Sequence, residues 1–185
     1  MDDTEQLLTA VEKSAHATPR WERYPLPAAL SAEDIAHAEA ALGFPLPPLL
    51  TALYTRIANG GFGPEYGLLP LTGGLAPDGE QSVIAQYLAH RRPASEDGQW
   101  PWPEGVLPIC SLGCGMYSCV DCRNDRTTVL LHEPNADDPH HAWYVDQPDL
   151  ASWLRTWLDG TGWYGEDSDD EALEMQPWPD YNARI

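Results

Sequence analysis

The chain has 185 residues, a hydrophobic fraction of 43% and eight tryptophans, which indicates one folded domain with a substantial core. Twenty-nine Asp and Glu residues against ten Lys and Arg residues give a net charge of −19. Nucleic acids and anionic membrane surfaces would repel such a chain, so we exclude both as partners. No apolar run reaches the ~20 residues that a membrane-spanning helix needs.

The first 30 residues predict a helix followed by a connector. Leu7, Leu8 and Val11 fit one face of a short amphipathic helix, and we assign residues 1–19 to an N-terminal helical extension. The opening MDDTEQ is acidic where a secretory signal peptide is basic, so we expect a cytoplasmic protein.

Residues 31–61 predict two helices joined by a proline elbow. Ser31 is a good N-cap residue, and Asp34 stands three residues later, as in a capping box. Gly43 supplies the left-handed residue that ends the first helix. The second helix starts near Pro48, since proline is tolerated in a first turn. After it, residues 66–71 predict a short strand.

The second half of the chain predicts strands and a closing helix. A helix is expected near residues 83–88, and strands are expected at 106–111, 116–121, 127–132 and 142–145. An apolar stripe at helical spacing then follows, formed by Leu150, Trp153, Leu154, Trp157 and Leu158. Helices first and a strand meander later are typical of an α+β fold, with the amphipathic C-terminal helix packed on a mostly antiparallel sheet. Residues 166–185 are acidic, and we expect a flexible tail there.

Several short motifs in this order resemble the SUKH superfamily. That superfamily contains yeast cell-wall-synthesis regulators linked to killer-toxin resistance and bacterial toxin-immunity proteins. The residues that carry the resemblance are Glu39, Leu42, Gly43, Leu46, Pro47, Leu50, Tyr54, Asn59, Gly60 and Gly61, then residues 102–109, and Trp153 and Trp157 in the closing helix. The resemblance spans roughly residues 20 to 160, and we place the SUKH-like domain at residues 20–165. It implies a single α+β binding module without catalytic activity or a cofactor.

Four clustered cysteines are the best candidates for a metal site. Cys110, Cys114, Cys119 and Cys122 loosely fit two zinc knuckles, but only four residues separate the pairs. Alternation along strands would send these side chains to opposite faces of a sheet. We therefore interpret them as reduced thiols around a glycine hairpin and expect no bound metal.

Two regions are suited to binding another protein. Trp100 and Trp102 place aromatic rings on a proline-stiffened loop, and rigid aromatic residues are enriched among interface hot spots. Trp100 is the stronger candidate, because the family resemblance suggests that Trp102 belongs partly to the core. Asp169, Asp170 and Glu171 lie in the acidic tail, where they would attract a basic partner.

The sequence thus predicts a non-catalytic immunity protein that neutralises a cognate, basic toxin by covering its active surface. Two alternatives stay open at this point. One is a regulatory interaction scaffold, as the yeast relatives imply, and the other is a zinc-dependent enzyme that uses the cysteine and histidine residues.

Overall fold

The chain passes from a helical first half to a strand-rich second half. The computed structural model describes residues 2–17, 25–74, 76, 79–92, 100–138, 141–162 and 175–185. The helices are α1 (Asp3–Ala17), α2 (Ala32–Leu42), α3 (Pro48–Arg56), α4 (Val83–His90) and α5 (Leu150–Asp159), with a 3₁₀ helix at Tyr181–Ala183. The strands are β1 (Val106–Gly113), β2 (Met116–Asp121), β3 (Val129–His132), β4 (Trp143–Gln147) and β5 (Gln176–Pro177).

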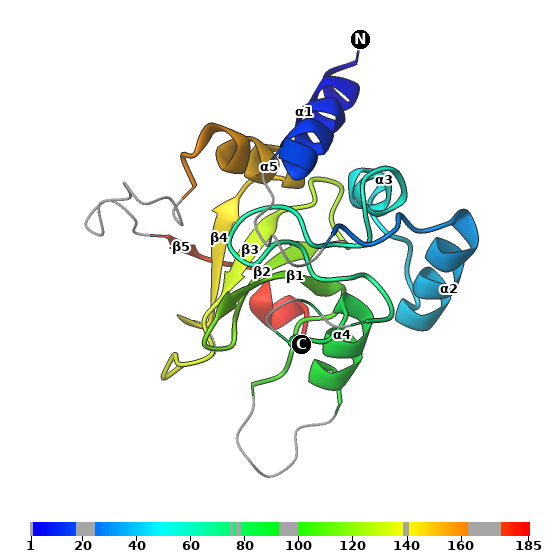
Figure 1. Cartoon of the computed structure of the whole chain (residues 1–185). Helices are drawn as coiled ribbons and strands as arrows, with labels where there is room; N and C mark the ends of the chain where they lie inside the picture. Colours follow the sequence, from blue (N-terminus) through cyan, green and yellow to red (C-terminus); the bar gives the residue numbers. More distant parts are fainter. Residues whose placement is uncertain are drawn as a thin grey trace.

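The five strands form one antiparallel sheet whose spatial order follows the chain, β1-β2-β3-β4-β5. The register sets Tyr117 opposite His132 and His132 opposite Trp143. Residues that face each other across antiparallel strands share one face of the sheet, so these three side chains form a row. The helices surround the sheet, with α1 and α5 on one side and α4 on the other (Figure 1). This architecture confirms the predicted α+β class.

The predicted capping of α2 is confirmed in detail. The Asp34 backbone N–H donates to Ser31 Oγ at 3.1 Å, and the Ser31 backbone N–H donates to Asp34 Oδ2 at 2.8 Å. These reciprocal bonds satisfy two N–H groups that have no partner within a helix. Gly43 ends the helix with a φ of 83°, the left-handed conformation that a side chain disfavours.

The strand expected at residues 66–71 is instead an extended segment with a single bridge, between Leu68 and Cys110. The Leu69 backbone N–H donates to Ile109 O at 2.8 Å, so the segment does run along the outer edge of β1. Pro70 follows directly and has no N–H to donate, which stops the ladder from growing.

The closing helix α5 packs against the sheet as predicted. Its side chains Leu150, Trp153 and Leu154 are buried, and the helix contacts β4, α1 and α3. Trp157 and Leu158 continue the same stripe and pack against the core while part-exposed. Asp149 caps the helix by accepting a hydrogen bond from the Ser152 backbone N–H at 2.6 Å.

The N-terminal helix α1 lies across α5 and α3 (Figure 1). It buries Leu7, Leu8 and Val11, so it belongs to the same core as the rest of the domain. At 15 residues it is still too short for a bilayer, and no helix in the described part of the chain has both the length and the apolarity to cross a membrane.

The C-terminal residues also join the core, whereas we expected a flexible tail over residues 166–185. Residues 175–185 pair β5 with β4 and bury Trp178 and Tyr181. The Trp178 N–H donates to Trp143 O at 2.9 Å. Arg184 then pairs with Asp121, whose side chain is completely buried. Residues 166–174 of the predicted tail lie outside the described residues.

The Arg184 pair predicts a large loss of stability on substitution. Arg184→Ala would leave a buried carboxylate without its counter-charge, which should lower the free energy of unfolding by about 3 kcal/mol. Arg123→Ala is the control, because Arg123 pairs with Glu104 at the exposed surface and such pairs contribute less than about 1 kcal/mol. Denaturant unfolding at pH 7 measures both variants, and equal losses would contradict the assigned role of the buried pair.

Candidate protein-interaction site

The first group of motif residues holds the proline elbow between α2 and α3. Glu39 lies in α2, and its Oε1 accepts a hydrogen bond from the Leu46 backbone N–H at 2.8 Å. Leu42 and Leu46 are buried on either side of this bond, and Pro47 precedes the first turn of α3. These residues fix the angle between two helices, which is a structural role.

The second group of motif residues clamps the extended segment beside β1. The buried Tyr54 hydroxyl donates to Leu69 O at 2.9 Å. Asn59 accepts from the Leu71 N–H at 2.8 Å and donates to Thr72 O at 2.9 Å. Gly60 has a φ of 84°, and a Cβ there would lie 2.6 Å from Leu68 O, so only glycine fits. Gly61 completes the turn by donating its N–H to Leu68 O at 2.8 Å.

Trp102 lies in the interior, with only 4% of its surface exposed. Its indole N–H donates to Val106 O at 2.7 Å, and its ring packs against Trp143 with the ring centroids 4.8 Å apart. The sequence named both Trp100 and Trp102 as partner-binding residues. In the structure Trp102 anchors this loop to the core, because its apolar ring is packed and its single N–H donor is hydrogen-bonded inside the protein.

Trp100 remains 42% exposed on the segment that Trp102 anchors. Pro101 O accepts a hydrogen bond from the Tyr181 hydroxyl at 3.0 Å, and the Glu104 N–H donates to Arg184 O at 2.7 Å. The C-terminal residues therefore brace the backbone on both sides of Trp102. A large aromatic side chain on a braced backbone loses little conformational entropy when it docks. We call the exposed residues Trp100, Pro101 and Glu104 the Trp100 surface.

The charge near the Trp100 surface is mixed. Arg91 and Arg92 are exposed at the end of α4, and Arg91 donates to Trp102 O at 2.6 Å. Glu104 pairs with Arg123 on the other side of the segment. The acidic residues that the sequence named, Asp169, Asp170 and Glu171, lie outside the described residues.

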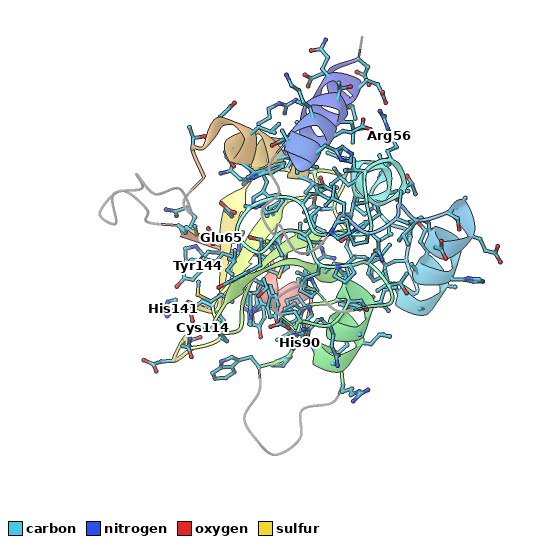
Figure 2. All side chains as sticks on the ribbon, viewed as in Figure 1. Arg56, Glu65, His90, Cys114, His141 and Tyr144 are labelled. Atoms are coloured by element: carbon cyan, nitrogen blue, oxygen red, sulfur yellow. The ribbon has the colours of Figure 1, made fainter. Side chains whose placement is uncertain are left out.

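A cluster of polar and aromatic side chains lies between α4 and the sheet. We call it the His90–His132 cluster; it comprises Glu80, Gln86, His90, Trp102, Tyr117 and His132. The Tyr117 hydroxyl donates to Glu80 Oε2 at 3.1 Å, and the Gln86 amide donates to the same carboxylate and to the Tyr117 hydroxyl. The His90 ring stacks on Trp102 with centroids 4.1 Å apart, and the His132 ring lies 4.9 Å from Trp102. Figure 2 shows His90 between α4 and the strands.

Burial keeps both histidines of this cluster neutral at pH 7. The pKa of His132 is lowered to about 4, mainly by burial and also by the nearby His90, against a hydrogen bond to the Gly115 backbone that raises it. Burial also lowers the pKa of His90. One nitrogen of each ring, His90 Nε2 and His132 Nδ1, is buried without a hydrogen-bond partner among the described residues. Two such atoms, in rings that both contact Trp102, are unusual in a folded core.

This cluster was not predicted from the sequence. Gln86 and His90 are four residues apart and therefore on one face of α4, which was a readable signal. His132 and Tyr117 become neighbours only through the strand register, which the sequence left open.

The four cysteines do not gather into one site. Cys110 and Cys119 are buried in neighbouring strands, Cys122 is part-buried, and Cys114 is exposed at the tip of the β1–β2 hairpin (Figure 2). Burial raises the pKa of Cys119 and of Cys122, which disfavours the thiolate that binds zinc. Within the described ranges, no three His, Cys, Asp or Glu side chains converge as metal ligands would.

The histidine pair predicts a specific loss of stability in mild acid. The pKa of His132 is lower in the folded than in the unfolded chain, so stability is full above about pH 6.5 and falls as the pH drops toward 4. His132→Gln should remove about 2 kcal/mol of this fall between pH 7 and pH 4. His141→Gln, at an exposed position, is the control. Urea unfolding across the pH range measures the difference, and identical pH profiles for wild type and His132→Gln would refute it.

Comparison with protein families assigns the fold. The family model for the SMI1 / KNR4 family (SUKH-1) matches residues 29–156, which run from just before α2 into α5. No match was found among curated proteins. The matched region contains the elbow and the clamp described above, and it leaves out α1 and β5. The chain therefore belongs to the SMI1 / KNR4 family (SUKH-1).

Proposed function

We propose that this protein is an immunity protein that binds a basic toxin and blocks its active surface. The proposal rests on family membership, since the SUKH superfamily includes toxin-immunity proteins, together with a net charge of −19. The net negative charge is the observation that supports a basic partner. It produces a negative field that attracts cationic proteins from a distance.

The clamp and the elbow support a binding role rather than a catalytic one. The polar motif residues Glu39, Tyr54 and Asn59 form hydrogen bonds within the protein, and so they have a structural role. The surface is thereby free to differ between relatives that bind different partners. A rigid scaffold with a variable surface suits proteins that recognise individual toxins.

The Trp100 surface would supply the short-range contact in this proposal. Trp100 offers the kind of aromatic anchor that dominates interface energetics, and its neighbours are braced by Tyr181 and Arg184. Long-range attraction would bring the toxin close, and Trp100 would hold it there. Association and dissociation rates therefore report on different parts of the protein.

A direct test measures neutralisation of a toxin. A basic protein captured on the immobilised chain and identified by mass spectrometry is assayed for toxic activity with and without the chain. Complete inhibition at a one-to-one ratio is expected. Full activity of the captured protein at a stoichiometric excess of this chain would overturn the immunity role.

Steering by acidic residues predicts a salt-dependent association rate. Replacing Asp169, Asp170 and Glu171 with Asn, Asn and Gln should lower the association rate roughly threefold at low salt and leave the dissociation rate nearly unchanged. The difference should shrink near physiological ionic strength, where the Debye length is about 8 Å. Surface-based binding kinetics across a salt series measure this, with thermal unfolding as the folding control. An association rate that does not depend on salt would contradict electrostatic steering.

The anchor role of Trp100 predicts the opposite kinetic pattern. Trp100→Ala should raise the dissociation rate about tenfold or more and change the association rate little. Trp100→Phe keeps an aromatic ring and should recover most of the loss. Leu88→Ala removes another exposed apolar side chain, on α4, and serves as the matched control. If Leu88→Ala and Trp100→Ala have equal effects, Trp100 is not the anchor.

A further inference from the structure

The backbone next to Trp100 is held by a side chain from the C-terminal segment. The Tyr181 hydroxyl donates a hydrogen bond to Pro101 O at 3.0 Å. Pro101 directly follows Trp100, whereas Tyr181 comes 80 residues later and lies outside residues 29–156, which the family model matches. An exposed tryptophan inside the family region is thus attached to a segment that the family model does not cover.

Proline makes this single hydrogen bond effective. The ring of Pro101 fixes its φ at about −65°. A residue before proline is restricted to extended conformations, which limits ψ of Trp100. Two of the backbone angles that connect Trp100 to the bonded carbonyl are therefore already limited by covalent structure. The hydrogen bond to Pro101 O removes much of the freedom that is left.

Tyr181 is itself held in the core, so it can act as a support. Its side chain is 2% exposed, and its ring lies 6.4 Å from the Trp143 ring. It begins the 3₁₀ helix, and Arg184, which follows that helix, forms the buried ion pair with Asp121. A ring that is closely packed has few orientations, so its hydroxyl fixes the Pro101 carbonyl rather than moving with it.

The rest of the segment has supports within the family region. Trp102 O accepts a hydrogen bond from Arg91 at 2.6 Å, and the Gly105 N–H donates to the Tyr87 hydroxyl at 3.0 Å. Gly105 O also accepts from the Cys122 N–H at 2.9 Å. These contacts hold residues 102–105. Of the hydrogen bonds described here, the one from Tyr181 lies nearest to Trp100 along the chain.

We propose that Tyr181 is a positioning residue for Trp100, whose backbone it holds in the orientation in which the indole docks on the partner. The inference rests on the proposed function for the partner, and it goes further by naming the residue that orients the anchor. It also gives the C-terminal segment a part in partner binding, although Tyr181 is buried. Preorganisation of this kind lowers the entropic cost of docking and lengthens the lifetime of the complex.

Tyr181→Phe tests the positioning role without any partner, because it keeps the packed ring and removes the hydroxyl. Amide nitrogen relaxation NMR of the full-length chain reports on the backbone at Trp100. Its order parameter should be about 0.85 in the wild-type chain, as in rigid backbone, and should fall below about 0.6 in Tyr181→Phe. A low value in the wild-type chain, or an unchanged value in Tyr181→Phe, would overturn the proposal.

Tyr87→Phe is the matched control. It removes the hydroxyl of another buried tyrosine, and this hydroxyl bonds the same segment at Gly105. It should lower the melting temperature to a similar extent as Tyr181→Phe, yet leave the order parameter of Trp100 unchanged. An equal loss of order at Trp100 in both variants would show that Tyr181 has only a general structural role. If Tyr181→Phe does not fold, the order parameter of Trp100 in the wild-type chain decides.

Binding kinetics with the captured basic protein separate positioning from stability. Tyr181→Phe should raise the dissociation rate about threefold and leave the association rate nearly unchanged. In the Trp100→Ala background it should have no further effect, because it acts only through Trp100. Equal effects in both backgrounds would overturn the positioning role. The proposed function fails separately, because a partner that remains toxic while bound contradicts the immunity role and leaves these measurements unaffected.

Discussion

The fold depends on how the backbone of residues 68–72 finds its hydrogen-bond partners. Residues 68–71 of this extended segment are buried between α3 and β1, so their peptide groups need hydrogen-bond partners within the protein. Tyr54 and Asn59 bond it from the α3 side, and Leu69 donates to Ile109 in β1. Pro70 O and Leu71 O accept from the first N–H groups of α4. A single stretch of chain thus connects α3, β1 and α4, and two side chains replace the ladder that a regular strand would have formed.

Elements that depend on local interactions could be predicted from the sequence, whereas elements that depend on tertiary contacts could not. Ser31, Asp34 and Gly43 act locally, so the ends of α2 follow from the sequence. The strands of the meander were placed to within a few residues, because each carries its own apolar pattern. β5 was missed, since it has two residues and one of them is Pro177. Its place beside β4 is decided by tertiary packing of Trp178, which no local rule describes.

The candidate sites divide in the same way. Trp100 could be named as a candidate from the sequence, because a tryptophan directly before a proline in a polar loop is a local feature, and its side chain is indeed exposed. The His90–His132 cluster required α4, the Trp102 segment and two strands to be placed first.

Several arginines of this acidic chain form ion pairs between distant parts of the sequence. Arg56 and Arg155 attach α1 through Glu5 and Asp3, and Arg184 attaches the C-terminus through Asp121, so three of the arginines tie the chain ends to the core.

The ion pair between Arg184 and Asp121 connects two segments that are 63 residues apart in the chain. Closing a loop of this length costs chain entropy, so a contact across it is slow to form during folding. The side chain of Asp121 is completely buried, and a sheet that forms before residues 175–185 dock would contain a carboxylate without its counter-charge. The docking of this segment and the closure of the sheet are therefore expected to be one cooperative step.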